Sequence, residues 1–493
     1  MIIVTVNIDL YRYEIQALVK AFYPEEEVKV LPENEYPEAP FLAVQYENDA
    51  VTATVLPGTE QQFLRKADGT GKNPLTEKSK ESKDVLKHLI YQTLVSFTGR
   101  ELPWGELIGI RPTKIARKKR EEGCSKEETK AYLQEAHFVS DRKALLAVEI
   151  AEREREILHA THGKDGFSLY IGIPFCPTTC LYCSFPSNAL AAWKDRVDEY
   201  LDTLLSEMKQ VAGSLQNTAP DTIYIGGGTP TTLTEGQLER LLTETEKCFS
   251  KANCLEFTVE AGRPDSITKE KLLVLKRHGV DRISINPQSM RADTLSRIGR
   301  GHSPEAIEEA FALAREAGFQ SINMDIILGL PGEDVSDVRY TLEKIRTMQP
   351  DSLTVHTLAI KRGSRLDEQI REKGYENVFR AATEGGDPIE EMMEACLTIC
   401  GKMEMVPYYL YRQKNLRGNH ENIGFARQNC FGIYNSLIIE ETQSILAFGA
   451  GSISKAVYPD GRIVRSEDPK DIETYLTHIE ECIAKKRDLF QKL

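Results

Sequence analysis

The chain has 493 residues and a mass of 55.6 kDa, with 41% hydrophobic and 28% charged side chains. This length predicts about three domains, and the composition excludes a mainly disordered or collagen-like chain. The formal net charge of −13 disfavours non-specific binding to nucleic acid or anionic lipid. We find no apolar run near the ~18 residues of a membrane span and no basic stretch typical of a signal peptide. We therefore expect a soluble cytoplasmic protein with reduced thiols.

The N-terminal residues 1–100 have patterns typical of a small α/β domain. The apolar residues predict strands near 2–8, 26–31, 41–46 and 51–56 and helices near 10–22 and 83–97. The lysine-rich segment 69–83 indicates an exposed loop. Residues 101–165 are expected to form a helical connector, because the segment Ala116–Leu158 is charged and amphipathic.

Residues 166–375 repeat short β-branched runs that alternate with amphipathic stretches. The runs are 169–175, 222–227, 256–261, 282–287, 321–328 and 352–358, and the stretches include 195–214, 234–249, 268–278 and 304–317. Repeated βα units predict a parallel sheet with right-handed crossovers. About six units predict an α/β fold with a partial (β/α)6 TIM-like barrel, not a closed eightfold one. Residues 376–493 are expected to form a C-terminal α+β extension on the substrate side.

Three of the ten cysteines lie on one short segment, IGIPFCPTTCLYCSF. Cys176, Cys180 and Cys183 form a C-x-x-x-C-x-x-C run, which a chance distribution of the cysteines would rarely produce. Pro174 and Pro177 exclude helical geometry, so we expect the thiols on a loop. Cysteines in a reducing compartment are more often metal-binding or catalytic than disulfide-bonded, which favours a metal centre over an inert buried set.

Zinc is an alternative metal, but a structural zinc site requires a fourth ligand, commonly from a second cysteine pair. His159 and His162 lie before the strand that precedes the loop, and Cys396 and Cys400 lie on an apolar helical pattern expected in the core. Three thiolates without an obvious fourth favour an iron–sulfur cubane with one open iron, the arrangement of a catalytic site.

Polar and glycine-rich residues follow the predicted parallel strands, at the edge where barrel enzymes carry their active sites. The residues 226–230, GGGTP, follow the second strand, Glu260 lies near the end of the third, and Gln288 follows the fourth. Arg300 lies in RIGRGH, and Asp325 lies within the fifth strand. Glycine turns and buried carboxylates also have purely structural roles. Their common edge with the cysteine loop favours a cofactor site.

The cysteine loop after a strand, with Tyr182 directly before its last cysteine, resembles the signature of radical S-adenosylmethionine (radical SAM) enzymes. The resemblance implies a 4Fe-4S cluster whose open iron is chelated by the amino and carboxylate groups of S-adenosyl-L-methionine (SAM). In that family one electron cleaves the sulfonium, and the resulting 5′-deoxyadenosyl radical abstracts hydrogen from the substrate. The protein supplies positioning and excludes solvent.

The segments LYIGIPFC, GGGTP, TVEAGRP, RISINPQS, RIGRGH and MDIILGLPG resemble the oxygen-independent coproporphyrinogen III oxidase family, in its coproporphyrinogen dehydrogenase-type Bacillus-like branch. LPWGELIGIRPTK (102–114) and YYLYRQKN (408–415) share this resemblance. It implies oxidative decarboxylation of two propionates, from coproporphyrinogen III to protoporphyrinogen IX, in haem biosynthesis. The resemblance implies that Cys176, Cys180 and Cys183 ligate the cluster. It also implies cofactor contacts from Tyr170, Tyr182, Gly226, Gly227, Gly228, Thr229, Glu260, Gln288, Arg300 and Asp325.

Two positions depart from the pattern of that family. Phe185 stands where well-characterised oxidases have a further cysteine, and Gly172 stands where they have histidine. The phenylalanine is shared with the related haem chaperone branch, whose members bind haem without decarboxylation. The His-Asn-x-x-Tyr-Trp motif of that branch is not matched by 429–436, NCFGIYNS. A haem chaperone on this scaffold and a radical SAM enzyme with another organic substrate are therefore the alternatives.

The segment 408–417, YYLYRQKNLR, mixes aromatic and basic residues. Arg412 and Lys414 are predicted substrate contacts, because an acidic protein needs a local basic pocket for a tetracarboxylate and arginine suits carboxylates well. A solvated basic loop is the alternative. The expected partners are a porphyrinogen substrate and a one-electron donor resembling flavodoxin or ferredoxin, with no nucleic acid and no membrane.

Overall fold

The computed structural model describes residues 1–24, 26–36, 39–47, 50–56, 59–64, 77–183, 188–361, 363–379, 388–412 and 420–490. They form two compact units: Met1–Glu149 with Arg412–Glu421, and Ile150–Tyr411 with Asn422–Leu493. The division into four domains stays a prediction. Within the described residues, we find no helix with the length and apolar character needed to cross a membrane.

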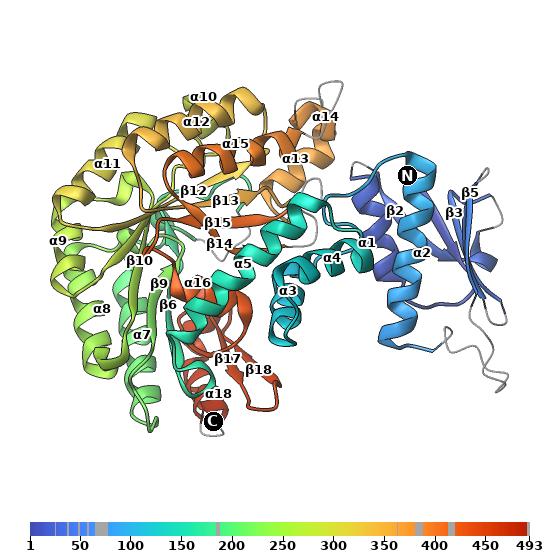
Figure 1. The fold of residues 1–493 in the computed structure, drawn as a ribbon. Coiled ribbons are helices and arrows are strands. Elements are labelled where there is room, and N and C mark those ends of the chain that lie inside the picture. The colour runs from blue at the N-terminus through green and yellow to red at the C-terminus, as the bar shows by residue number, and fades with distance from the viewer. Residues whose placement is uncertain are drawn as a thin grey trace. The chain divides into compact units, whose positions relative to one another are not determined.

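The N-terminal unit contains a five-stranded mixed sheet in the order β2-β1-β3-β4-β5. Its strands are β1 (Ile2–Val6), β2 (Val28–Pro32), β3 (Leu42–Glu47), β4 (Ala50–Val55) and β5 (Thr59–Leu64). Helices α1 (Arg12–Phe22) and α2 (Lys80–Thr98) contact this sheet and contribute to one apolar core (Figure 1). The predicted N-terminal strands and helices are confirmed as a small mixed sheet with two helices, with β5 as an additional strand.

The charged segment is helical, as predicted, and forms three helices: α3 (Pro112–Glu121), α4 (Lys126–His137) and α5 (Asp141–His159). Their starts have local causes. Pro112 occupies the first turn of α3, where a missing N–H costs nothing. Ser125 caps α4 by accepting from the Glu128 N–H, and the Glu128 side chain accepts from the Ser125 N–H in return.

The second unit is built on an eleven-stranded sheet in the order β14-β15-β13-β12-β11-β10-β9-β6-β16-β17-β18. Six consecutive strands pair in parallel, as predicted. They are β6 (Phe167–Ile173), β9 (Thr222–Gly227), β10 (Glu256–Gly262), β11 (Arg282–Ile285), β12 (Ser321–Leu328) and β13 (Ser352–Thr357). β6 and β11 end earlier than predicted, before Pro174 and Pro287, because proline has no N–H to donate to the ladder.

Along the chain, the crossover helices alternate with these strands, and the longer ones are labelled in Figure 1. The main ones are α7 (Val197–Ala212), α8 (Glu235–Cys248), α9 (Lys269–Arg277), α11 (Pro304–Glu316) and α12 (Val335–Met348), with shorter α6 (Leu190–Trp193) and α10 (Ala292–Arg297). Thr234 caps α8, and Asp334 caps α12, each by accepting backbone N–H groups that the first turn leaves unpaired. The predicted positions of the crossover helices are confirmed to within a few residues.

The C-terminal residues extend both edges of the sheet. On the β13 side, β15 (Asn422–Ala426) and β14 (Val406–Tyr411) add in antiparallel orientation. On the β6 side, β16 (Ser444–Phe448) adds in parallel, and β17 (Ile453–Val457) and β18 (Ile463–Glu467) follow in antiparallel orientation. Among the described strands, β14 and β18 stay as edges, so the pairing is that of an open sheet and leaves the predicted barrel unconfirmed.

The remaining helices are α13 (Arg365–Lys373), α14 (Tyr375–Val378), α15 (Pro388–Lys402), α16 (Ile433–Glu440), α17 (Ile472–Thr477) and α18 (Ile479–Phe490). The start of α16 lies against the amino end of β10, where the Glu256 carboxylate accepts from the Ile433 N–H at 2.7 Å. The buried Arg282, at the amino end of β11, donates to the Cys430 carbonyl at 2.9 Å. These bonds hold residues 430–433 at the amino ends of the parallel strands.

Candidate active site

The cysteine loop follows β6 and is held by backbone and side-chain bonds. Cys176, Cys180 and Cys183 are not in disulfide bonds and have intermediate exposure. The Leu181 N–H donates to the Ile298 carbonyl at 2.9 Å, and Thr229 Oγ1 donates to Cys176 Sγ at 3.5 Å. The loop is therefore anchored to residues that follow β9 and β11, in addition to its own strand.

The thiols of this loop affect one another electrostatically. Burial raises the pKa of Cys176 to about 11, and Cys183 and Cys180 raise it further, while Thr229 and Arg263 oppose the shift. Three thiolates near each other are therefore stabilised only by bound positive charge, and metal binding would release their protons. Within the described residues, no three His, Cys, Asp or Glu side chains surround a position for a single metal ion. In a cubane cluster, by contrast, each thiolate ligates a different iron.

Two buried arginines contact the loop. Arg263 forms an ion pair with Asp265 at 2.6 Å and donates to Thr178 Oγ1 at 2.8 Å. Arg300 donates to the Asn286 carbonyl at 2.5 Å, and its other terminal nitrogen lies 3.5 Å from Tyr182 Oη. Both guanidinium groups therefore bring positive charge to a loop whose thiols must ionise in order to bind metal.

The glycine turn after β9 lies directly against the cysteine loop. The Gly228 N–H donates to the Ile173 carbonyl at 2.8 Å, and the Thr229 N–H donates to the Phe175 carbonyl at 2.7 Å. A Cβ at Gly228 would lie 2.6 Å from the Phe175 carbonyl oxygen, and Gly227 has a φ of +108°. Glycine is therefore required here for close approach and for backbone conformation.

Glu260 is half-buried beside a group of tyrosines. Tyr224 Oη donates to its carboxylate at 2.5 Å, and the ring of Tyr224 stacks on Tyr434 with centroids 4.4 Å apart. Tyr170 stacks on both rings, at 6.2 and 6.4 Å. Burial raises the pKa of Glu260 to about 7, with Asp325 adding to the increase. Glu260 is therefore a carboxyl group that can gain or lose a proton near neutral pH.

Asp325 contacts one residue of its own strand, β12, and lies within ion-pair reach of one residue of the neighbouring strand β13. Its carboxylate accepts from Asn323 Nδ2 at 2.6 Å, and His356 Nε2 on β13 lies 3.9 Å away. The sequence did not assign a role to His356 or Tyr224. A signal existed for Tyr224, which lies two residues before Gly226 on the same strand and so on the same face of the sheet.

Several buried polar atoms next to these carboxylates have no hydrogen-bond partner in the protein. They are Ser284 Oγ, Asn286 Oδ1, Gln288 Oε1 and Arg300 Nε. Gln288 also has a φ of +64°, a left-handed conformation uncommon for a residue other than glycine. Buried unpaired donors and acceptors cost free energy unless a ligand satisfies them. These atoms, the glycine turn and the three thiols therefore fit a ligand with many polar groups bound beside a metal cluster.

Gly172, which departs from the family pattern, is crowded by the C-terminal strand β16. A Cβ built on Gly172 would lie 3.3 Å from the Phe448 carbonyl oxygen and 3.4 Å from Tyr170 Cε1. A Cβ on Gly449 would lie 2.6 Å from the Gly172 carbonyl oxygen. The end of β16 and the Tyr170 ring therefore leave only a tight space for a Cβ at this position, which is a physical reason for glycine here.

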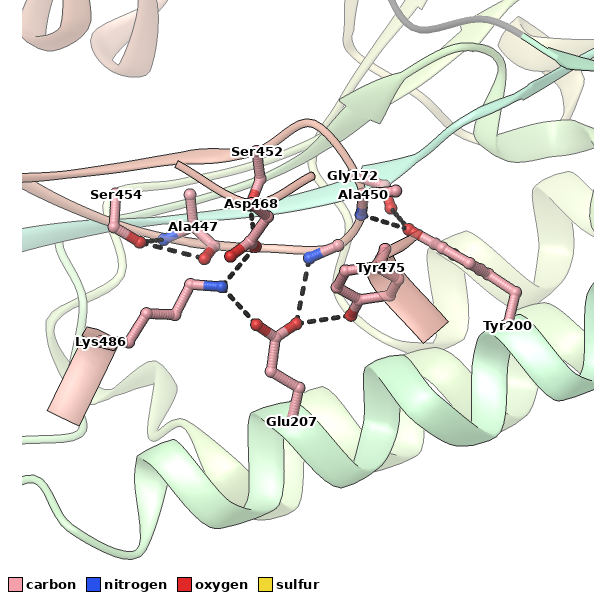
Figure 2. Close-up of polar contacts among 11 residues, drawn as sticks. Gly172, Tyr200, Glu207, Ala447, Ala450, Ser452, Ser454, Asp468, Tyr475 and Lys486 are labelled. Atoms are coloured by element: carbon pink, nitrogen blue, oxygen red, sulfur yellow. Dashed lines mark hydrogen bonds and ion pairs between the residues drawn. The ribbon is translucent and has the colours of Figure 1, made fainter. Parts of the chain in front are cut away.

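The same turn is tied to β6 through Tyr200 of α7 (Figure 2). Tyr200 Oη donates to the Gly172 carbonyl at 2.7 Å and accepts from the Ala450 N–H at 3.1 Å. Its ring packs edge-on against Phe175, the residue before the first cysteine, with centroids 5.2 Å apart. Tyr200 therefore links the C-terminal turn to the start of the cysteine loop.

A buried charged cluster connects five segments of the second unit (Figure 2). Lys486 of α18 contacts the carboxylates of Glu207 on α7 and of Asp468 after β18. Glu207 also accepts from Tyr475 Oη at 2.6 Å and from the Gly449 N–H at 3.2 Å. The C-terminal helices are thus bonded to the turn that packs on Gly172.

The predicted substrate residues lie apart from this group in the chain. Arg412 belongs to the N-terminal unit, is 6% exposed, and donates to the Leu107 carbonyl. Its guanidinium lies 5.4 Å from the ring centroid of Trp104. Lys414 and Phe185 lie outside the described residues. The substrate contacts stay predictions.

Comparison with known proteins places these features in context. Residues 170–345 match the model of the radical SAM superfamily. The oxygen-independent coproporphyrinogen-III oxidase-like protein HemZ of Bacillus subtilis is 41% identical over 408 residues, which cover 81% of this chain and 80% of HemZ. The heme chaperone HemW of Bacillus subtilis is 32% identical over 286 residues, which cover 58% of this chain and 70% of HemW.

A solved structure supports the fold assignment. The coproporphyrinogen III oxidase HemN from Escherichia coli, a radical SAM enzyme, aligns with a TM-score of 0.51 and 21% identity. The alignment covers 66% of this chain and 72% of HemN. At this identity the likeness shows a shared mixed α/β fold and carries no statement about activity.

Proposed function

We propose that this chain, which belongs to the oxygen-independent coproporphyrinogen III oxidase-like family of the radical SAM superfamily, converts coproporphyrinogen III to protoporphyrinogen IX. It is a radical SAM enzyme that resembles coproporphyrinogen III oxidases, and the family implies a 4Fe-4S cluster and SAM. The observation that carries the proposal is the juxtaposition of three thiols on one loop, a glycine turn and unpaired buried polar atoms in a family member.

Cys176, Cys180 and Cys183 would hold the cluster. Thr229, which donates to Cys176 Sγ, would stabilise the thiolate, as hydrogen bonds to a ligand sulfur commonly do. Arg300 would add positive charge near Cys180, whose side chain contributes to the raised pKa of that guanidinium. These contacts support a loop that is held in place before the metal binds.

The remaining polar residues would hold SAM. Its amino, carboxylate and ribose hydroxyl groups would satisfy donors and acceptors that the protein leaves unpaired. The proposed contacts are Tyr170, Tyr182, Gly226, Gly227, Gly228, Thr229, Glu260, Gln288, Arg300 and Asp325. When bound, the cluster and SAM would supply one-electron cleavage of the sulfonium and a radical that abstracts hydrogen.

The protein groups would position a propionate of the substrate and exclude water. Transfer of one hydrogen atom from the side chain to the radical, release of carbon dioxide and transfer of one electron to a separate one-electron acceptor together would give the vinyl group. The stacked rings of Tyr170, Tyr224 and Tyr434 lie beside Glu260 and would exclude water from that part of the site when substrate is bound. Arg412 and Lys414 are the proposed contacts for other propionates, and a flavodoxin- or ferredoxin-like protein is the proposed electron donor.

Product analysis tests this function directly. Protein reconstituted with iron and sulfide under anaerobic conditions is mixed with dithionite, SAM and coproporphyrinogen III, and the porphyrins are separated after oxidation. We expect protoporphyrin from the wild type and none from Cys176→Ala, which should also lose cluster iron. Formation of 5′-deoxyadenosine without any vinyl product would overturn the substrate and favour a radical SAM enzyme with another organic substrate.

A haem chaperone without decarboxylase activity is the alternative function. One observation argues against it: Tyr434, in the segment 429–436, is 4% exposed and stacks on Tyr224 and Tyr170. The start of α16 is also capped by Glu256. This segment is thus engaged in packing within the second unit. Stable haem binding by reconstituted protein that forms no vinyl product would favour the chaperone.

A further inference from the structure

Two tyrosines of β14 reach across β15 to side chains of β13. The strands lie in the order β13-β15-β14. Tyr409 Oη donates to Thr354 Oγ1 at 3.2 Å, and Tyr411 Oη lies 3.3 Å from His356 Nδ1. The two rings are nearly parallel, with centroids 6.5 Å apart. Gly424 of β15 makes the crossing possible, because a Cβ at that position would overlap the ring of Tyr409.

The two hydroxyl contacts differ in their access to solvent. Tyr409 is 3% and Thr354 is 4% exposed, so their contact is part of the core. The side chain of His356 is 29% exposed, and that of Asp325 beside it is 18% exposed. A molecule from solvent can therefore reach His356 and Asp325, whereas it cannot reach the contact between Tyr409 and Thr354.

The imidazole of His356 lies between a phenol and a carboxylate. Tyr411 contacts Nδ1, which fixes the ring orientation. Nε2 lies 3.9 Å from Asp325 Oδ2, within ion-pair reach but beyond the ~3.2 Å limit of an N–H···O hydrogen bond. The Asp325 carboxylate already accepts from Asn323 at 2.6 Å. Nε2 therefore keeps hydrogen-bonding capacity toward the side that solvent can reach.

We propose that His356 donates from Nε2 to a carboxylate of the substrate, with Tyr411 as its positioning residue. The proposal rests on the function proposed above, in which the substrate is a tetracarboxylate. Glu260 and Asp325 are both acidic. An anionic propionate of the substrate that approaches them therefore needs a hydrogen-bond donor beside these two carboxylates. A hydrogen bond from imidazole or imidazolium to a carboxylate is charge-assisted and supplies that donor.

Equilibrium binding of two probes tests this contact. The first probe is coproporphyrin III, the stable oxidised tetracarboxylate, and the second is its tetramethyl ester, which has the same ring without the charges. Binding is followed by the fluorescence anisotropy of the porphyrin with anaerobically reconstituted protein. We expect His356→Phe to weaken binding of the acid about tenfold and to leave binding of the ester unchanged. His356→Gln keeps a hydrogen-bond donor and should lose less affinity for the acid.

The paired tyrosines give a matched control. Tyr411→Phe removes the hydroxyl that orients His356, so we expect binding of the acid to weaken about threefold, with the ester unaffected. Tyr409→Phe removes a hydroxyl from the same strand and the same stack, but its partner is Thr354, so the acid should bind as in wild type. Circular dichroism and iron content check that each variant is folded, and His356→Ala replaces His356→Phe if the latter does not accumulate.

The outcomes separate this inference from the proposed function. If the wild type binds coproporphyrin III and His356→Phe binds it equally well, the His356 contact is wrong while the function stands. If acid and ester weaken equally, the side chain acts by packing and the carboxylate contact is also wrong. If the wild type does not bind coproporphyrin III at all, both the proposed function and this inference fail.

Discussion

The ammonium of Lys486 contacts the carboxylate of Glu207 where neither side chain is exposed to solvent (Figure 2). Asp468 contacts the same ammonium, so one positive charge faces two acidic groups. Burial raises the pKa of Glu207. Burial alone would lower the pKa of Lys486, but the two carboxylates raise it. The lysine is therefore charged, and it holds helix α18 against α7 and the turn on Gly172.

We expect Lys486→Met to be strongly destabilising. The substitution leaves Glu207 and Asp468 buried without their counter-charge, and breaking a buried ion pair in this way costs about 3–5 kcal/mol. The melting temperature of the apo protein should fall by about 5 °C or more. Iron content after reconstitution should fall as well. Glu207 is bonded to the turn after β16, and Tyr200 links that turn to the start of the cysteine loop.

Lys485→Met is the matched control on the same helix. Its side chain is 53% exposed and forms an ion pair with Glu481 one turn away, an interaction worth less than about 1 kcal/mol. Its melting temperature should stay close to that of the wild type. Equal melting temperatures for the two variants would mean that the buried cluster does not hold the C-terminal helix.

A second prediction concerns Gly172→His, which introduces the residue of the well-characterised oxidases. The Phe448 carbonyl and the Tyr170 ring leave too little room for the new side chain, and overpacking of this kind costs about 1–3 kcal/mol. We expect a lower melting temperature. Gly236→His on α8 is the control, because nothing lies within 4 Å of a Cβ there. A stable Gly172→His variant with wild-type iron content would contradict the role given to the turn after β16.

The sequence predicted the six parallel strands because each is a short β-branched run that ends at a proline, a glycine or a polar residue. It did not predict β5, TEQQFL, since polar residues dominate this strand. The antiparallel extensions and the open edges of the sheet were also beyond prediction. They depend on how C-terminal strands far along the chain pair with β6 and β13.

The site likewise combines residues on strands that are neighbours in the chain with residues on C-terminal segments far along the chain. The cysteines, the glycine turn and the carboxylates could be brought together from sequence, because they follow strands that are neighbours in both chain order and sheet order. Tyr434 and Tyr411 could not, since their roles depend on contacts between C-terminal segments and the parallel strands. The crowding of Gly172 was hidden for the same reason, because its neighbour is the turn after β16.

The third prediction is a pH dependence of stability that arises from Glu260. Burial raises its pKa from 4.5 to about 7. Such a group contributes stability that is fully present below its unfolded pKa and is lost as pH rises through the folded value. Relative to Glu260→Gln, the apo wild type should therefore lose about 3 kcal/mol between about pH 4.5 and about pH 7. Melting temperatures of both proteins across this window measure the difference.

Two further variants check that Glu260 is responsible. Glu333 is buried, and its pKa is raised to about 7. Glu333→Gln should therefore remove a second, separate contribution to the pH dependence of stability. Glu316, with a 60% exposed side chain paired with Lys269, should have no such effect when changed to Gln. A pH profile of Glu260→Gln that parallels the wild type would show that this carboxyl group ionises without penalty.

The last prediction concerns Arg412, whose side chain packs within the N-terminal unit. Arg412→Ala removes the contact with the Trp104 ring and leaves the Leu107 carbonyl without its donor, which should cost about 2–3 kcal/mol. Lys114→Ala, an exposed position on α3 in the same unit, should change stability by less than about 0.5 kcal/mol. Melting temperature and coproporphyrin III binding should be measured on both variants. Weaker porphyrin binding by Arg412→Ala at an unchanged melting temperature would contradict this packing role, whereas a lower melting temperature with unchanged porphyrin binding would contradict the proposed contact with a substrate carboxylate.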